Sequence, residues 1–189
     1  MRRINWDDLG ELNQDELKIK VLGGEKTALT IGVFDGLHRG HKALIERVTG
    51  KAPGLLPAVV TFRDNPKKLH GIINFEEKMA LLGSMGVALA VIIDFSEHFS
   101  KINGRDFILA LHRYLSPAYI GLGVNFHCGY HRDTDAKAFK AMAESLGIDT
   151  EIIPPVMEGG LAVSSSRIRA ALKEGRTGEA ALLLGRSFN

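Results

Sequence analysis

Two histidines follow a short apolar run in the first quarter of the chain. Positions 29–41 read LTIGVFDGLHRGH, in which an Asp-Gly turn leads from the apolar run to His38 and His41. Histidines three positions apart share one face of a helix that starts there. The first helical turn presents unpaired N–H groups and the positive end of the helix dipole, and both favour phosphate. Gly36 and Gly40 let the backbone approach a bulky anion. The pattern predicts a nucleotide triphosphate site. For either histidine alone, a capping or surface role would be preferred.

A second stretch, VSSSRIRAAL at positions 163–172, has the same character. Three serines precede a predicted helix, and Arg167 and Arg169 lie in its first turn. Positive side chains are unfavourable at the start of a helix, because the helix dipole is positive there. Two arginines at this position are explained if they bind an anion together with the free N–H groups. The alternative is a serine cap followed by solvated arginines. Together, the two stretches indicate two independent phosphate-binding segments.

Two weaker patterns follow predicted strands. The segment GLGVNFHCGYHRD at positions 121–133 is rich in glycine and aromatic residues, which indicates a loop that folds over a ligand. His127, Cys128 and His131 lack a matching distant pair, so no metal site is expected. The segment VVTFRDNP at positions 59–66 ends a strand in a proline turn and is a candidate for contact with a second substrate.

The bulk composition narrows the class of protein. The 189 residues suggest one domain, and 24 basic against 22 acidic residues give a net charge of +2. This balance argues against a general nucleic-acid or membrane-surface binder. No signal peptide and no apolar run of about 20 residues are apparent. With a single cysteine, Cys128, the sequence favours a reducing, cytoplasmic location. Nothing in it indicates an oligomeric state.

Apolar, strand-like runs alternate with helical patterns along the chain. Strands are expected at 28–34, 58–62, 88–95, 118–123 and 150–153, and helices at 40–49, 75–85, 104–115, 135–146, 165–173 and 177–184. This rhythm predicts an α/β fold with a parallel sheet covered on both faces. Residues 1–27 are less regular and suggest a loosely attached arm with one short strand. Ligands of such sheets bind beyond the carboxyl ends of the strands, where the segments described above would meet.

The motif GVFDGLHRGH, combined with the distal VSSSRIR, resembles those of the HxGH/ISSTxIR nucleotidyltransferases. Within them the chain is most similar to the adenylyltransferase module of bacterial bifunctional riboflavin kinase/FMN adenylyltransferases, the FAD synthetases. The likeness runs from about Thr27 to Phe188 and includes FSEHFSKINGRDFI and ALLLGRSF. It implies a Rossmann-like, doubly wound parallel sheet. It also implies transfer of AMP from ATP to FMN to give FAD and pyrophosphate, with Mg²⁺ held through the ATP phosphates and no protein metal ligands. The expected partners are small-molecule substrates, without nucleic acid or membrane.

The resemblance also implies roles for individual residues. The expected catalytic residues are His38, His41 and Arg169. The expected ATP-binding residues are Gly32, Phe34, Asp35, Gly40, Ser164, Ser165 and Ser166, of which Ser166 stands where the family usually has threonine. The expected flavin-binding residues are Phe62, Asn65 and Asn125.

Three segments depart from the family pattern, all on the expected flavin side. TFxPHP is TFRDNP here, with Asp64 and Asn65; FxFG is FHCG; and the loop that usually reads Arg-x-Gly-Asp has the sequence RDTD at positions 132–135. Two alternatives therefore stay open, namely an adenylyltransferase for another phosphorylated acceptor and a non-catalytic nucleotide- or flavin-binding paralogue. Residues 1–189 are expected to form a single nucleotidyltransferase domain without a riboflavin kinase domain.

Overall fold

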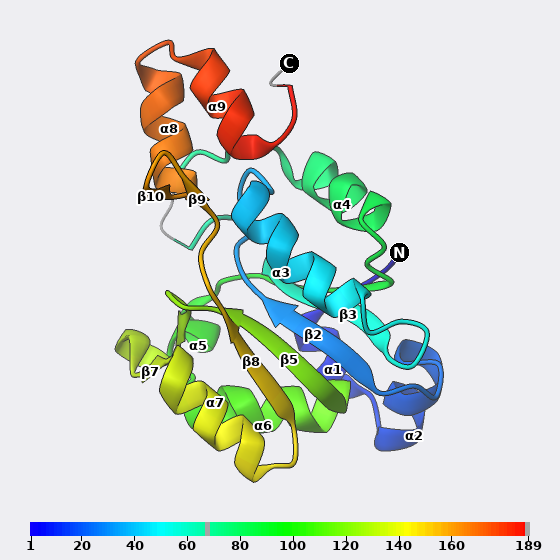
Figure 1. The fold of residues 1–189 in the computed structure, drawn as a ribbon. Coiled ribbons are helices and arrows are strands. Elements are labelled where there is room, and N and C mark those ends of the chain that lie inside the picture. The colour runs from blue at the N-terminus through cyan, green and yellow to red at the C-terminus, as the bar shows by residue number, and fades with distance from the viewer. Residues whose placement is uncertain (67–68, 188–189) are drawn as a thin grey trace.

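The computed structural model describes residues 1–66 and 69–187, and its centre is a six-stranded parallel sheet (Figure 1). Along the sheet the strands follow the order β1-β4-β3-β2-β5-β8, and every neighbouring pair is parallel. Their bounds are β1 (Arg2–Asn5), β2 (Thr27–Ile31), β3 (Leu56–Phe62), β4 (Leu89–Ile93), β5 (Pro117–Gly123) and β8 (Asp149–Ile153). The connections diverge on either side of β2 and β5, which makes the crevice between these two strands the expected ligand position.

Helices cover both faces of the sheet, as predicted for a Rossmann-like, doubly wound α/β fold (Figure 1). The helices are α1 (Trp6–Glu11), α2 (Gln14–Glu16), α3 (Arg39–Thr49), α4 (Phe75–Ser84), α5 (Glu97–Ser100), α6 (Gly104–Leu115), α7 (Ala136–Ser145), α8 (Ser165–Lys173) and α9 (Thr177–Leu184). Shorter elements are the π-helical turn η1 (Leu17–Val21), the 3₁₀ turn η2 (Tyr130–Arg132), and the two-residue strands β6 (His127–Cys128), β7 (Thr134–Asp135), β9 (Met157–Glu158) and β10 (Leu161–Ala162). The Phe188 that ends the family likeness lies outside the described residues.

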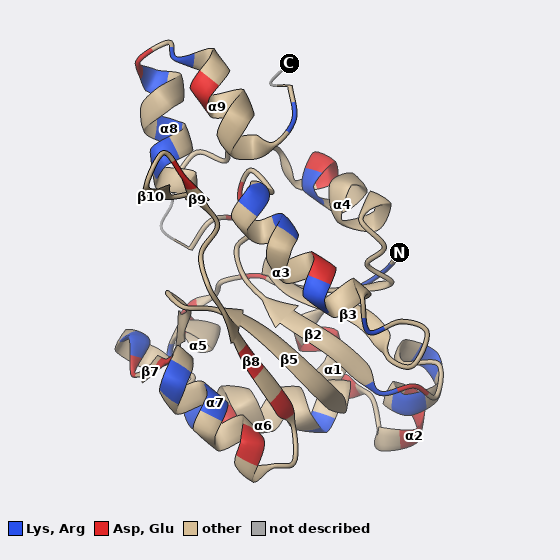
Figure 2. Ribbon diagram, viewed as in Figure 1, with Lys and Arg blue, Asp and Glu red and all other residues tan. Residues whose placement is uncertain are grey.

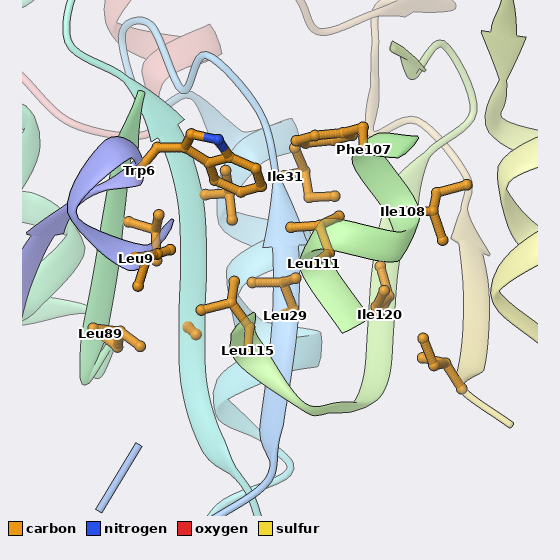
Figure 3. Packing of buried hydrophobic residues seen from close by; sticks show 14 of the residues in the cluster. Trp6, Leu9, Leu29, Ile31, Leu89, Phe107, Ile108, Leu111, Leu115 and Ile120 are labelled. Atoms are coloured by element: carbon orange, nitrogen blue, oxygen red, sulfur yellow. The ribbon is translucent and has the colours of Figure 1, made fainter. Parts of the chain in front are cut away.

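The hydrophobic core is divided by the sheet. One face packs Leu29, Ile120 and the neighbouring strands against the apolar side of α6, where Leu111 and Leu115 are fully buried (Figure 3). The opposite face packs Val59 and other strand residues against α3 and α4. Every residue of β2 and β4 is buried, as expected for a parallel sheet covered on both sides. The run is entirely apolar in β4, while β2 also buries Thr27 and Thr30.

The N-terminal segment differs from the loosely attached arm that the sequence suggested. One short strand is present, and β1 extends the sheet by pairing with β4. The helix that follows is anchored in the main core, where Leu9 is fully buried and Trp6 is 7% exposed. The Trp6 ring contacts Phe99, Phe107 and Tyr114 with centroid distances of 5.8, 5.4 and 6.0 Å. Its hydrophobic partners lie about a hundred residues further along the chain, where local sequence patterns cannot show them.

The first predicted strand ends earlier than expected. The ladder of β2 stops at Ile31, and the chain then takes left-handed backbone angles at Phe34 (φ 52°), Gly36 (φ 79°) and Leu37 (φ 41°). Such angles are strained for residues with a side chain. The apolar character of Phe34 comes from a fully buried ring within this turn and not from a strand position.

A helical hairpin of α8 and α9 stands at the carboxyl end of the sheet (Figure 1). It has its own small apolar cluster, which includes Val163, Ile168 and Leu183. Both helices have the predicted bounds. Within residues 1–66 and 69–187, no helix is both long and apolar enough to span a membrane.

We expect Trp6→Ala to destabilise the protein by about 3–5 kcal/mol, the usual cost of truncating a buried aromatic residue. Urea unfolding followed by circular dichroism measures this change. Ile19→Ala is the matched control in the same segment, since Ile19 is 69% exposed and such substitutions stay within about 0.5 kcal/mol. Equal stabilities of the two variants would show that the segment is loosely attached after all.

Candidate active site

A cavity of about 660 Å³ opens at the carboxyl end of the sheet. It lies between the segments that follow β2 and β5, at the point where the strand connections diverge. All thirteen residues that the sequence assigned to ATP, flavin or catalysis line it, namely Gly32, Phe34, Asp35, His38, Gly40, His41, Phe62, Asn65, Asn125, Ser164, Ser165, Ser166 and Arg169. Its volume is in the usual range of ligand pockets.

The start of α3 forms one wall of the cavity. His38 is the N-cap residue, and its Nδ1 accepts a hydrogen bond from the His41 N–H at 3.3 Å. A neutral His38 therefore carries its proton on Nε2. The two imidazole rings stack with centroids 3.6 Å apart, and the Phe34 ring meets the His41 ring edge-on at 5.3 Å. The Nδ1 atom of His41 is buried and has no hydrogen-bond partner within the described part of the chain.

Burial makes both histidines weak bases. It lowers the pKa of His38 to about 4. The pKa of His41 is also held well below its usual range, first by burial and then by electrostatic effects of His38 and Lys78. At pH 7 in the absence of an anion, the two imidazoles are therefore neutral N–H donors. Sequence spacing could not show how deeply the α3 start is buried.

The start of α8 forms the facing wall. Ser164 is its N-cap and accepts from the Arg167 N–H at 3.3 Å. The Ser165 hydroxyl donates to the Asp35 carbonyl oxygen at 2.9 Å, and Arg169 forms an ion pair with the Asp35 carboxylate. The two predicted phosphate-binding stretches are thus joined at Asp35, although more than a hundred residues separate them.

Arg167 does not share this site. Its guanidinium donates to the carbonyl oxygens of Glu158 (2.7 Å) and Leu161 (3.3 Å) and pairs with Glu179 at 3.1 Å. These contacts tie the β9–β10 hairpin to α8 and α9. Figure 2 shows basic residues along α8 beside the acidic residue of β9. Arg167 and Arg169 have different partners because residues two positions apart on a helix point to different sides of it.

The opposite end of the cavity is aromatic. Phe62 packs against Phe95 and Phe99 with centroid distances of 5.9 and 6.3 Å, and all three line the cavity together with Phe107. Sequence reasoning assigned the flavin to Phe62 and gave the other three no role, although Phe95 ends a predicted strand at the rim where ligands of such sheets bind.

The loop after β5 is fixed by Asp133, which lies in one of the segments that depart from the family pattern. Its carboxylate accepts from the Gly104 N–H at 3.1 and 3.3 Å, and Gly129 packs so closely that a Cβ there would lie 2.0 Å from Asp133 Oδ1. His131 and Arg132 have left-handed φ angles of 54° and 59°. Strained residues of this kind concentrate at binding sites.

The cavity residues offer little for a metal ion. Burial raises the pKa of the Cys128 thiol to about 12, with a further contribution from Asp133, so the thiol stays protonated. Within the described residues, no group of three or more histidine, cysteine, aspartate or glutamate side chains could hold a metal ion.

Lys78 is a buried cation that the sequence analysis missed. Its Nζ donates to the carbonyl oxygens of Phe62 (2.6 Å), the last residue of β3, and Val33 (3.4 Å), two residues beyond β2. Burial lowers its pKa to about 8, and the carboxylates of Asp35 and Asp64 oppose that shift. The sequence pattern does indicate that position 78 is buried, since it lies three residues after Phe75 on the apolar side of α4.

Comparison with known proteins agrees with these motifs. A family model described as FAD synthetase matches residues 23–167. The chain belongs to the FAD synthetase family. The adenylyltransferase resemblance seen in the motifs is thereby confirmed.

Curated FAD synthetase relatives are bifunctional riboflavin kinase/FMN adenylyltransferases. That of Escherichia coli K12 is 29% identical over 174 residues, covering 87% of this chain and 56% of the relative. That of Bacillus subtilis 168 is 28% identical over 182 residues, covering 86% and 54%. The chain thus spans about half the length of the curated relatives it matches.

The fold also resembles the solved structure of a protein from Streptococcus pneumoniae that is described as a macrolide-efflux protein. The TM-score is 0.82 at 25% sequence identity, and the match covers 100% of this chain and 63% of that chain. The word efflux in that description refers only to the Streptococcus pneumoniae protein. The likeness supports the α/β fold of this member of the FAD synthetase family.

We expect acid to destabilise the fold through His38. Because its pKa is lower in the folded than in the unfolded chain, the unfolded chain binds more protons between about pH 6.5 and 4. The stability contribution is present above pH 6.5 and is lost as the pH falls toward about 4, with a slope of at most about 1.4 kcal/mol per pH unit. Urea unfolding of the parent and His38→Asn, which keeps an N-cap residue, at pH 7 and 5 measures it.

In this experiment His112→Asn serves as the control, since His112 is an exposed histidine on α6. It should keep the parent's pH dependence. A slope for His38→Asn that equals the parent's would contradict the assignment.

Proposed function

We propose that this chain transfers AMP from ATP to FMN, giving FAD and pyrophosphate. The observation that carries the proposal is the convergence of two helix starts on one cavity, with His38 and His41 on α3 and the serines and Arg169 on α8. Membership of the FAD synthetase family supports it, as do relatives whose names include FMN adenylyltransferase.

The proposed reaction is an in-line displacement at phosphorus. An oxygen of the FMN phosphate attacks the α-phosphorus of ATP, a new P–O bond forms, and the bond from the α-phosphorus to the bridging oxygen breaks to release pyrophosphate. A phosphate monoester is largely ionised at pH 7, so the nucleophile needs no strong general base. Catalysis then depends on orientation and on stabilising charge in the transition state.

The two walls divide these tasks. The N–H groups at the starts of α3 and α8 favour the triphosphate, and Arg169 adds a full positive charge. His38 and His41 contribute neutral N–H donors from a buried position, where a hydrogen bond to an anion is strong. The aromatic end around Phe62, Phe95 and Phe99 suits the flat flavin ring, while Asn65 and Asn125 supply polar contacts near it.

Magnesium fits this site as a companion of the nucleotide. Asp35 is the acidic residue among those that line the cavity, and its carboxylate is already paired with Arg169. A bound Mg²⁺ would be held mainly by phosphate oxygens and water, and would neutralise charge on the departing pyrophosphate.

Another phosphorylated acceptor is the second candidate. The exposed Asp64 and the strained Arg132 lie in segments that depart from the family pattern on the acceptor side. A non-catalytic paralogue is the third, although the retained His38, His41 and Arg169 favour an enzyme.

Small-molecule substrates and a cytoplasmic reaction with ATP complete the proposal. Riboflavin phosphorylation is not expected of residues 1–189.

An assay with ATP, Mg²⁺ and FMN tests the proposal, with FAD and pyrophosphate as the products to be detected. His41→Ala and Arg169→Ala should each lower turnover about 10²–10³-fold, because one preorganised donor contributes about 2.7–4 kcal/mol to the barrier. His112→Ala and Arg105→Ala, both on exposed positions of α6, are matched controls and should turn over normally. Parent-like rates in both site variants would disprove the assignment of the site.

The same assay separates the candidate functions. Consumption of ATP with other phosphorylated acceptors but not with FMN would support the second candidate, and binding of ATP without any product would support the third. FMN formed from riboflavin and ATP, with contaminating kinase excluded, would contradict the expectation for riboflavin.

The altered segment at Asp64 and Asn65 should weaken FMN binding. A negative charge at 64 repels the phosphate of the flavin unless Arg63 compensates, and Arg63 is engaged by Asp94 at 2.7 Å. Lys67 and Lys68 follow in the sequence and could also compensate, but they lie outside the described residues. We expect the double variant with Asp64→Pro and Asn65→His to bind FMN more tightly and ATP equally well in calorimetric titrations. Tight FMN binding by the parent, without improvement in the variant, would show that the change is neutral.

A further inference from the structure

Arg186 reaches the turn that carries the cavity histidines from the far end of the chain. It follows Gly185, whose left-handed conformation (φ 70°) ends α9. The Arg186 Nη1 atom donates to the carbonyl oxygens of Gly36 (2.8 Å) and Leu37 (3.2 Å). The two carbonyls belong to the segment between β2 and α3, about 150 residues earlier in the chain.

This contact is partly buried and closely packed. Burial lowers the pKa of the Arg186 guanidinium, against the opposing effect of Glu77. A Cβ at Gly185 would lie 2.9 Å from the Arg39 Cγ, so the end of α9 presses on the first residue of α3. Arg186 itself is not among the residues that line the cavity. Its effect on a bound ligand would therefore pass through the turn.

The turn needs such support because its backbone is strained. Phe34 and Leu37 both hold left-handed φ angles, which residues with a side chain keep only where their surroundings enforce them. Groups from distant segments fix the turn from outside. The Ile72 N–H donates to Asp35 Oδ1 at 2.7 Å, the Ser165 hydroxyl donates to the Asp35 carbonyl oxygen, and Arg169 pairs with the Asp35 carboxylate. The Arg186 guanidinium adds the bonds to the Gly36 and Leu37 carbonyls. The next residue after the turn is His38.

Arg186 also links the two walls of the cavity. It is carried by α9, which packs on α8 through Leu183, Leu184 and Ile168. The helix that begins with the serine segment is thus joined to the turn that begins α3. Ser165 and Arg169 connect the two walls directly, and both line the cavity. Arg186 does not line the cavity and provides a second connection between the walls.

We propose that Arg186 is a positioning residue for the nucleotide: its hydrogen bonds to the Gly36 and Leu37 carbonyls set the start of α3, and with it His38 and His41, against the start of α8. This inference rests on the proposed function, since ATP is the ligand that would span the two helix starts. Loss of the guanidinium displaces one wall, so it weakens ATP binding more than it slows the chemical step.

Arg186→Ala, Arg186→Lys and the control Arg176→Ala test this role. Arg176 lies at the other end of α9, where it pairs with Glu174 and Glu179. In the FMN adenylylation assay and in titration with ATP and Mg²⁺, Arg186→Ala should raise both KM and Kd for ATP about 10- to 100-fold, the range for losing hydrogen bonds to a charged group. Arg186→Lys should recover part of this, because it keeps a cationic donor. Arg176→Ala should match the parent.

A merely structural role would give another pattern. Partial unfolding of Arg186→Ala would lower the active fraction and hence kcat, with KM for ATP unchanged, and circular dichroism would detect it. An unchanged KM in Arg186→Ala would overturn the inference, whether or not kcat falls.

Ring resonances of the seven histidines, measured by NMR without ligand, give a readout independent of ATP. Arg186→Ala should shift the signals of the stacked His38 and His41 and leave that of His112 in place. If the parent neither binds nor turns over ATP, the proposed function fails, and shifted His38 and His41 signals would still support the role of Arg186 in the turn. Unshifted signals would overturn that role.

Discussion

The buried ion pair between Asp35 and Arg169 is the contact on which the candidate site depends. The Asp35 side chain is 7% exposed and that of Arg169 is 25% exposed, and 134 residues separate them in the chain. Removing one partner of such a pair leaves an uncompensated buried charge, which is far more costly than the net contribution of the pair. The Ser165 hydroxyl adds a second bond, to the Asp35 main chain. The pair therefore joins the two walls of the candidate site, and it balances the charge of Arg169 at the cavity wall.

Burial accounts for much of the chemistry available at this site. A low local dielectric makes His38 and His41 neutral, lowers the pKa of Lys78 and keeps the Cys128 thiol protonated. The same low dielectric strengthens each hydrogen bond made to an entering phosphate. The histidine end of the site is thus a set of fixed dipoles beside the paired Arg169 guanidinium, and not a cluster of free charges. A dry, preorganised arrangement of this kind favours a reaction that needs positioning more than it needs a proton acceptor.

The sequence predicted the sheet, most of its helices and many of the residues that line the cavity, because buried parallel strands and helix starts leave strong local patterns. The bounds of α6, α8 and α9 were correct to the residue. Contacts between segments far apart in the chain could not be predicted from local sequence patterns. The docking of Trp6 on Phe107, the diversion of Arg167 to Glu179 and the bond from Arg186 to Leu37 all depend on which elements meet in space. Charge states were equally inaccessible, because they follow from burial.

The position of β1 has a consequence for how the chain acquires its structure. The first strand pairs with Leu89–Ile92, and Trp6 packs on a ring at position 107, so these contacts bring together segments that lie roughly a hundred residues apart in the chain. Pairing across such a span also delays folding, since loop closure must precede the contacts that reward it. We therefore expect β1 and α1 to be among the last segments to become ordered. Until then, the outer edge of β4 is an unpaired strand edge, open to association with other chains.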